Sequence, residues 1–147
     1  MLSLIHILEA PSGKNAQTTE LIGVDDPALL KELADIMAMP YAPSAKAAVI
    51  VITEPQVVFN GRSFHVQDYS AAIENMLLTI ADMGFASVWA EGVTCTDDKN
   101  ARIAKLLGIP DNKTVVCYMP IGEAANPGKQ APRKPFNERA WFNGYRR

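Results

Sequence analysis

Residues 47–53 read Ala-Ala-Val-Ile-Val-Ile-Thr, a run that is apolar at all but its last position and rich in β-branched side chains. A strand with one face in water alternates apolar and polar residues, and this run does not alternate. The pattern therefore predicts a central strand that is covered on both faces. Pro55 and the Asn60-Gly61 pair, which favour turns, follow the run.

Strands and helices are predicted to alternate on both sides of this strand. Apolar stretches predict further strands at 19–24, 87–90 and 114–121. Apolar residues at helical spacing predict helices at 27–39 and 66–83, and a third that Thr96 or Asp97 caps and Gly108 closes. The alternation indicates one layered domain over residues 1–147, of the α/β or α+β class. Its last part, from about residue 122, is rich in proline and is expected to be an extended arm.

Composition excludes several classes of protein. The chain has 147 residues, of which 48% are hydrophobic and 20% charged, with a formal net charge of −2. This balance is ordinary for a globular protein, and no basic run is long enough to predict a nucleic-acid surface. No apolar run approaches the roughly 20 residues of a membrane span, and the apolar start lacks the cationic region of a signal peptide. Two cysteines without CxxC spacing favour free thiols in a reducing cytoplasm.

The sequence also lacks several catalytic motifs. It contains neither a GxxxxGK[ST] phosphate loop nor a GxGxxG turn after a strand. His6 and His65, the two histidines, do not cluster with acids or thiols, so no metal site is predicted. Ser12 has no GxSxG context, which argues against nucleophilic hydrolysis. No side chain is therefore predicted to act as a catalytic nucleophile, acid or base.

A polar turn near the start of the chain is the strongest candidate for a binding site. Residues 10–17 read Ala-Pro-Ser-Gly-Lys-Asn-Ala-Gln. Glycine permits close backbone approach to a ligand, and serine and asparagine favour local turns. The stretch therefore offers several hydrogen-bonding groups with little side-chain bulk, although Pro-Ser-Gly is first of all a turn.

Six segments, taken in order, resemble the FMN-dependent nitroreductase family. They are Pro11–Gln17, Ala71–Leu78, Met83–Gly92, Leu106–Pro110, and Pro120–Ala124 followed by Pro132–Pro135. No single segment is specific, but their joint order covers essentially the whole chain. The resemblance implies an α+β fold with a central mixed, mainly antiparallel sheet. It also implies an intertwined homodimer with two FMN molecules at the interface between the subunits.

The resemblance further implies which residues bind the cofactor. Pro11, Ser12, Gly13 and Asn15 match the loop that reaches the flavin from the partner subunit, and Gln17 matches the glutamine after it.

Two later segments would complete this site. Glu91 and Gly92 match the turn whose backbone N–H groups approach the N5 and O4 edge of the flavin. Arg133 matches the arginine that binds the FMN phosphate, and Lys129 lies close enough in sequence to assist it. For each of these residues an ordinary structural role, as a turn residue or a solvated side chain, is the alternative.

The chain departs from the family pattern at its start. Family members normally carry two helices before the Pro-Ser-Gly turn, and the first of these binds the FMN phosphate through arginine and serine. Met1–Glu9 contains no arginine or lysine, so this cationic clamp is expected to be missing. A truncated N-terminus, a misassigned N-terminus and a minimal variant remain equally open as explanations.

The function expected from the resemblance is the transfer of hydride from NAD(P)H through FMN to an electrophile such as a nitroaromatic or a quinone, in ping-pong order. The alternative is a non-catalytic flavin-binding or structural dimer that has lost the phosphate clamp. A third possibility keeps the fold and changes the reaction, as in flavin destructases or dehalogenating relatives.

Overall fold

Four antiparallel strands form the centre of the molecule. The computed structural model describes residues 9–126 and 128–146. The strands are β1 (Thr19–Val24), β2 (Ala47–Thr53), β3 (Ala86–Ser87) and β4 (Thr114–Gly122), and they lie in the order β1-β2-β4-β3. Every strand pair in this sheet is antiparallel. Because β2 has β1 on one side and β4 on the other, the predicted central strand is confirmed.

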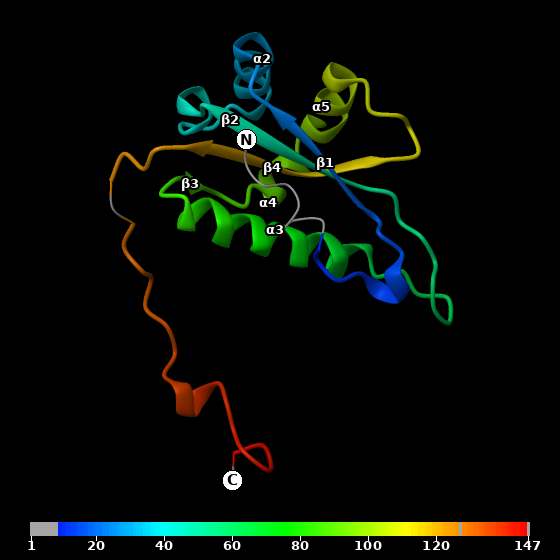
Figure 1. The fold of residues 1–147 in the computed structure, drawn as a ribbon, viewed down its shortest axis with the longest axis vertical. Helices are drawn as coiled ribbons and strands as arrows, with labels where there is room; N and C mark the ends of the chain where they lie inside the picture. Colours follow the sequence, from blue (N-terminus) through cyan, green and yellow to red (C-terminus); the bar gives the residue numbers. More distant parts are fainter. Residues whose placement is uncertain (1–8, 127, 147) are drawn as a thin grey trace.

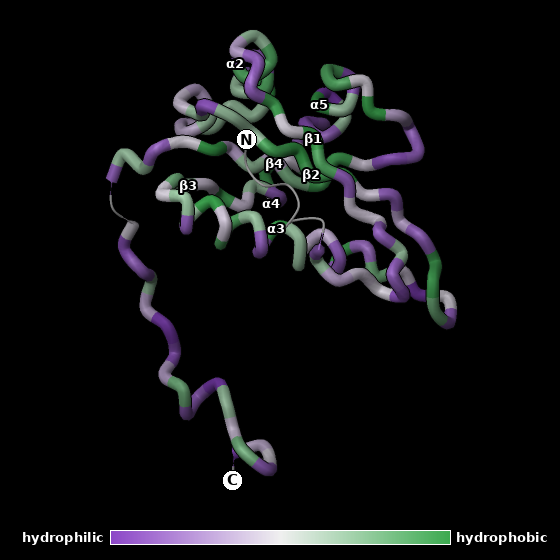
Figure 2. The backbone as a smooth tube through the Cα atoms, in the orientation of Figure 1, coloured by the Kyte–Doolittle hydropathy of each residue, from purple (hydrophilic) through white to green (hydrophobic). Residues whose placement is uncertain are grey.

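Helices cover both faces of the sheet (Figure 1). The helix α3 (His65–Asp82) lies along one face, and α2 (Pro27–Met37) and α5 (Lys99–Leu107) lie along the other. The alternate side chains of β2 accordingly enter two separate apolar clusters, with Val49 and Val51 on the α3 side and Ile50 and Ile52 on the other. Figure 2 shows the apolar residues concentrated along β2 and β4. Among the described residues, no helix is both long enough and apolar enough to cross a membrane.

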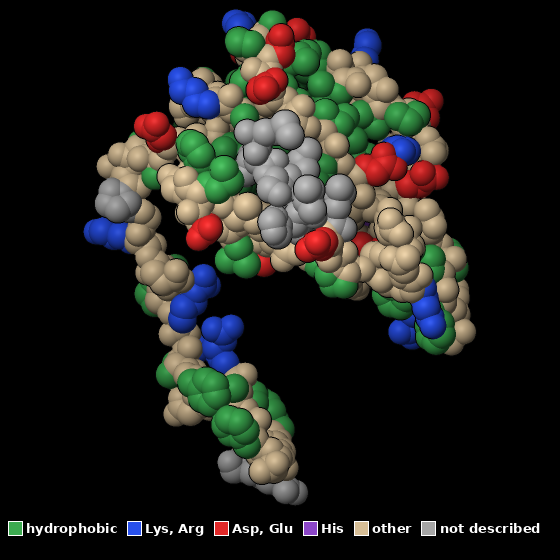
Figure 3. Space-filling model, viewed as in Figure 1, with side chains coloured by type: hydrophobic (Ala, Val, Ile, Leu, Met, Phe, Trp, Pro, Cys, Tyr) green, Lys and Arg blue, Asp and Glu red, His purple; other side chains and the backbone are tan. Residues whose placement is uncertain are grey.

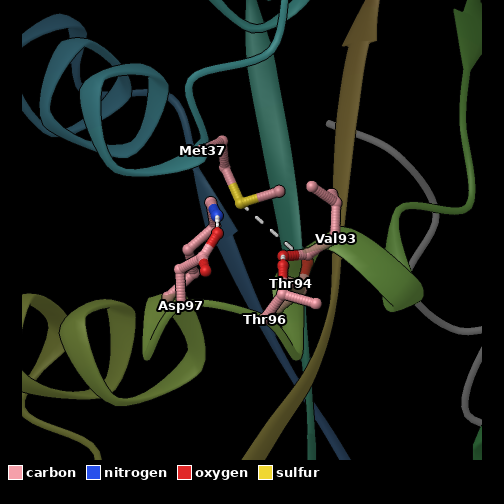
Figure 4. A network of polar contacts seen from close by, with 6 residues as sticks. Met37, Val93, Thr94, Thr96 and Asp97 are labelled. Atoms are coloured by element: carbon pink, nitrogen blue, oxygen red, sulfur yellow. Dashed lines mark hydrogen bonds and ion pairs between the residues drawn. The ribbon is translucent and has the colours of Figure 1, made fainter.

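The predicted start of α2 is confirmed, and that of α5 is wrong. The Asp26 carboxylate accepts hydrogen bonds from the backbone N–H groups of Ala28 and Leu29, each at 2.9 Å, which satisfies donors at the helix start. The α5 helix follows Asp98, whose side chain makes no capping bond. Asp97 instead binds the ammonium of Lys99 at 2.8 Å (Figure 4), because that buried lysine needs an acidic partner.

The segment after α3 differs from its predicted form. Gly84 follows α3 with a φ of 81°, as expected for a residue just beyond a helix. The strand predicted at 87–90 shrinks to Ala86–Ser87. The chain then turns into a short helix, α4 (Glu91–Thr94), which the sequence did not predict. The remaining elements are the single-turn segments η1 (Gly13–Asn15), η2 (Ala42–Ser44) and η3 (Phe136–Glu138).

The chain after β4 leaves the sheet as an extended arm (Figure 1), which confirms that prediction. Most residues of the arm are exposed, and its one regular element among the described residues is η3. Lysine and arginine side chains gather along it (Figure 3). The expected absence of a cationic clamp concerns Met1–Glu9, and of these residues Met1–Leu8 lie outside the described part.

Candidate functional site

The polar turn at residues 11–17 forms one wall of a small pocket. The pocket has a volume of about 170 Å³ and is lined by Ala10, Pro11, Ser12, Gln17, Thr19, Leu21, Asp68 and Ala72. The Ser12 hydroxyl oxygen accepts a hydrogen bond from the backbone N–H of Gln17 at 3.0 Å and so closes the turn. The Thr19 hydroxyl is buried and has no hydrogen-bond partner among the described residues. The pocket is therefore walled by an ordered turn that carries backbone and hydroxyl groups.

The backbone of this turn is strained. Lys14, Asn15 and Gln17 have φ values of 54°, 56° and 50°. These values lie in the left-handed region, which is unfavourable for residues other than glycine. Such conformations persist only where the surroundings hold them, and they often occur at functional sites. The side chains of all three residues are exposed, so the strain presents polar groups to the outside.

Asp68 of α3 holds this turn, although no sequence motif had marked it as a site residue. One carboxylate oxygen accepts from the Gly13 N–H at 2.8 Å, and the other accepts from the Thr18 hydroxyl at 2.7 Å. Asp68 is only 4% exposed. A signal was available in the sequence, because Asp68 shares the helical phase of the buried residues Ala72 and Met76. A carboxylate on the buried face of a helix requires donors nearby.

The second predicted part of the site, Glu91 and Gly92, lies at the start of α4. The Glu91 carboxylate is half-buried and accepts two hydrogen bonds, from the Tyr69 hydroxyl at 2.7 Å and from the Trp89 indole N–H at 2.9 Å. Burial, followed by the hydrogen bond to Glu91, raises the pKa of the Tyr69 hydroxyl, so that this group remains a donor. Gly92 is exposed, and a Cβ atom built on it would meet nothing within 4 Å. The carboxylate thus fixes this segment internally while the backbone at Gly92 stays open.

Side chains from several elements hold α4 against the sheet. The Thr94 hydroxyl accepts from the backbone N–H of Tyr118 in β4 at 3.2 Å and lies 3.9 Å from the sulfur of Met37 (Figure 4). The Cys95 thiol, at the end of α4, donates to the backbone carbonyl of Val116 in β4 at 3.6 Å. The open backbone at Gly92 therefore belongs to a rigidly supported element.

The thiol of Cys117 predicts a loss of stability at alkaline pH. Burial raises its pKa from 9.0 to about 12, so the unfolded chain loses this proton first as the pH rises. The protonated Cys117 thiol makes its full contribution to the free energy of unfolding below pH 9.0, and this contribution disappears as the pH approaches 12. At about pH 10.5 we expect the free energy of unfolding to have dropped by about 2 kcal/mol through this group.

Urea denaturation of the wild type and of Cys117→Ala at about pH 8 and about pH 10.5 measures this effect. The variant should lose less stability between the two pH values, whatever its cavity costs at either one. Equal losses in both proteins would exclude the thiol as the source.

The cationic residues predicted to bind phosphate lie elsewhere in the chain. Lys129 and Arg133 are both exposed on the arm. Figure 1 shows this arm leaving the sheet at the opposite side from η1. The structure therefore brings the turn and the α4 segment to one helix, α3, and leaves the arm cations apart from them.

The described residues offer polar groups that suit an organic ligand. No group of three or more histidine, cysteine, aspartate or glutamate side chains is placed to hold a metal within the described ranges. The turn and α4 offer neutral donors and open backbone, and the arm offers the exposed cations Lys129 and Arg133. Such a set can bind a polar ring system and an anionic tail, while a bound cofactor would supply the chemistry.

Known proteins resemble this chain along most of its length. The sequence model of the nitroreductase family matches residues 59–123. A protein of Archaeoglobus fulgidus, named for NADH dehydrogenase or NAD(P)H nitroreductase activity, is 35% identical over 114 residues, which cover 77% of this chain and 65% of that protein. The chain spans 57–65% of the length of the three curated relatives that it matches.

Solved structures agree in fold. One from Bacteroides thetaiotaomicron, named for the same two activities, is 30% identical with a TM-score of 0.76, covering 97% of this chain and 82% of that one. An FMN-dependent nitroreductase of Clostridium difficile has a TM-score of 0.78 at 24% identity, covering 97% of this chain and 84% of that one. These likenesses confirm the expected α+β fold, and with the sequence matches they show that the chain belongs to the nitroreductase family.

Proposed function

We propose that this chain is an FMN-dependent oxidoreductase that takes reducing equivalents from NAD(P)H and passes them to a small electrophile such as a nitroaromatic or a quinone. The proposal includes one domain over residues 1–147, a homodimer and a cytoplasmic location. One observation carries it: α3 holds both the Pro11–Gln17 turn and the Glu91–Gly92 segment, while Asn15, Gln17 and Gly92 stay exposed. Backbone groups that are held in place and yet exposed could form hydrogen bonds with the edge of a flavin ring.

The residues present fit the cofactor. Pro11, Ser12, Gly13, Asn15 and Gln17 would contact it through a turn of low bulk, beside the unpartnered Thr19 hydroxyl. Backbone N–H groups of Glu91 and Gly92 would face the N5 and O4 edge. Arg133, assisted by Lys129, would bind the phosphate, since a guanidinium suits bidentate contact with phosphate oxygens.

The bound flavin would supply the redox chemistry, accepting hydride from NAD(P)H and then reducing the acceptor in ping-pong order. The chain's own residues would bind and orient the ring, and none is assigned as a general acid or base. The Glu91 carboxylate already accepts two hydrogen bonds, which assigns it to holding α4. Substrate choice would then depend on the shape of the open site.

The exposed arm supports the dimeric part of the proposal. Phe136, Phe142 and Tyr145 are 66%, 77% and 70% exposed in one protomer. Aromatic side chains exposed together commonly mark a surface that a partner covers. A second copy of the chain that receives the arm would bury these rings and complete two equivalent sites.

Titration of FMN against the purified protein, followed by flavin fluorescence, tests the proposal. Arg133→Ala should weaken FMN binding about tenfold to a hundredfold, because a charge-assisted hydrogen bond to phosphate is lost. Arg139→Ala, an exposed arginine on the same arm, is the matched control and should leave the affinity unchanged. Riboflavin, which lacks the phosphate, should bind the wild type and Arg133→Ala equally.

Two results would count against the proposal in different ways. Tight FMN binding that is indifferent to Arg133 would show that the phosphate lies elsewhere. A protein that binds no FMN and oxidises no NAD(P)H would contradict the enzyme and favour the non-catalytic alternative.

A further inference from the structure

The Asp68 carboxylate is buried without a cation beside it. It is 4% exposed, and no ion pair of Asp68 occurs among the described residues. Its two oxygens are satisfied by the Gly13 N–H and the Thr18 hydroxyl, at 2.8 and 2.7 Å. The next residues on this face of α3, Ala72 and Met76, are buried and apolar. The carboxylate therefore contributes something other than packing.

The two donors that bind Asp68 bracket the strained part of the turn. Lys14, Asn15 and Gln17, the residues with positive φ, all lie between Gly13 and Thr18. These conformations are unfavourable for residues that carry a Cβ atom, so a free turn would relax out of them. One rigid carboxylate bound to both ends prevents that relaxation.

Thr18 is also hydrogen-bonded to residues beyond Asp68, whereas among the described residues Gly13 has no such additional bond to a distant element. The Thr18 carbonyl accepts from the Thr53 hydroxyl and from the Glu54 N–H, both at 3.1 Å. At the other end, the hydrogen bond that joins Gly13 to α3 in the described structure is the one to Asp68. Removal of the carboxylate should thus release the Gly13 end while Thr18 stays fixed to β2.

We propose that Asp68 is the positioning residue of the Pro11–Gln17 turn and holds it in the left-handed conformation that contacts FMN. Asp68 itself would not touch the cofactor, since it acts through Gly13 and Thr18. The first part of this inference, that Asp68 holds the turn, is independent of the proposed function. The second part, that the turn held in this way contacts FMN, rests on the proposed function.

Hydrogen exchange of the backbone amides of Gly13–Thr18 tests the first part without any flavin. Asp68→Ala should raise exchange at the Gly13 end about tenfold or more, because local opening becomes easier there. Asp68→Asn should restore most of the protection, since its amide can still accept from Gly13 and donate to Thr18. Asp82→Asn, an exposed aspartate at the other end of α3, is the control and should change nothing.

FMN titration of the same variants tests the second part. Asp68→Ala should weaken binding about tenfold, and Asp68→Asn should stay within about threefold of the wild type. A role in folding alone would instead make affinity follow the loss of thermal stability in both variants. If Asp68→Ala does not fold, Asp68→Ser takes its place, because its short side chain with one hydroxyl oxygen cannot bind both Gly13 and Thr18 as the carboxylate does.

Each outcome decides something distinct. Unchanged exchange in Asp68→Ala would overturn the proposal outright. Faster exchange with unchanged FMN affinity would leave Asp68 as a holder of the turn and overturn its role in binding. A wild type that binds no FMN would contradict the proposed function and this second role together, and exchange would still decide the first.

Discussion

Replacement of Glu91 by alanine should destabilise the protein by about 2–4 kcal/mol. The change removes the acceptor of two hydrogen bonds and leaves the Tyr69 hydroxyl and the Trp89 indole N–H without partners. Tyr69 is only 5% exposed, so water cannot take over the role of the carboxylate there. An unsatisfied buried donor costs about 1–3 kcal/mol, and bonds to a charged acceptor are at the strong end of the range.

Urea denaturation measures the effect, and Trp89 provides a fluorescent reporter at the altered position. Glu91→Gln keeps one carbonyl acceptor and should lie between the wild type and alanine. Glu74→Ala, an exposed glutamate of α3, is the control and should change stability by less than about 0.5 kcal/mol. If Glu91→Ala were as stable as this control, the carboxylate would not be what holds α4.

Replacement of Gly13 by alanine is expected to cost about 1–3 kcal/mol and to abolish tight flavin binding. A Cβ atom on Gly13 would lie 2.6 Å from Cδ2, 2.7 Å from Cβ and 2.8 Å from Cγ of Phe64. Rotation of the ring cannot relieve this contact, because the Phe64 Cβ atom is itself too close. The backbone of the turn must move away from α3, and the bond from Gly13 to Asp68 must lengthen with it.

Thermal denaturation and FMN titration together measure this change. Gly23→Ala is the matched control, because Gly23 is exposed in β1 and a Cβ atom there meets nothing within 4 Å. The control should retain both stability and affinity. A Gly13→Ala protein with the affinity of the wild type would mean that the turn does not contact the cofactor.

The sheet and the longer helices could be predicted from sequence because their signals are local. The run at 47–53 contains its own evidence for burial on both faces, and Asp26 is adjacent in sequence to the N–H groups that it caps. Helix α4 could not be predicted in this way. Its four residues are too short for a periodic signal, and contacts with Tyr69 and Tyr118, distant in sequence, hold it in place.

The candidate site likewise contains residues that the sequence could identify and residues that only the folded structure reveals. The family resemblance identified the turn, Glu91, Gly92 and Arg133 as candidate site residues. It did not identify the residues that hold the turn and the Glu91–Gly92 segment in place. Asp68 lies 55 residues from Gly13 in sequence, and only folding brings the two together. The cap expected at Asp97 was wrong for a local reason, since the buried ammonium of Lys99, two residues further on, binds that carboxylate.

The pairing of β2 with β4 has a consequence for the order of folding. Ala47 pairs with Ile121 and Thr53 with Thr114, so this ladder closes a long loop of chain that contains α3, α4 and α5. Closing such a loop costs conformational entropy before the contacts between the two strands offset it. Non-local pairings of this kind therefore slow folding. During synthesis β4 also leaves the ribosome after β1 and β2. The Glu91–Gly92 segment, which rests on β4 through Thr94, should therefore become ordered late, after β1 and β2 have had time to pair.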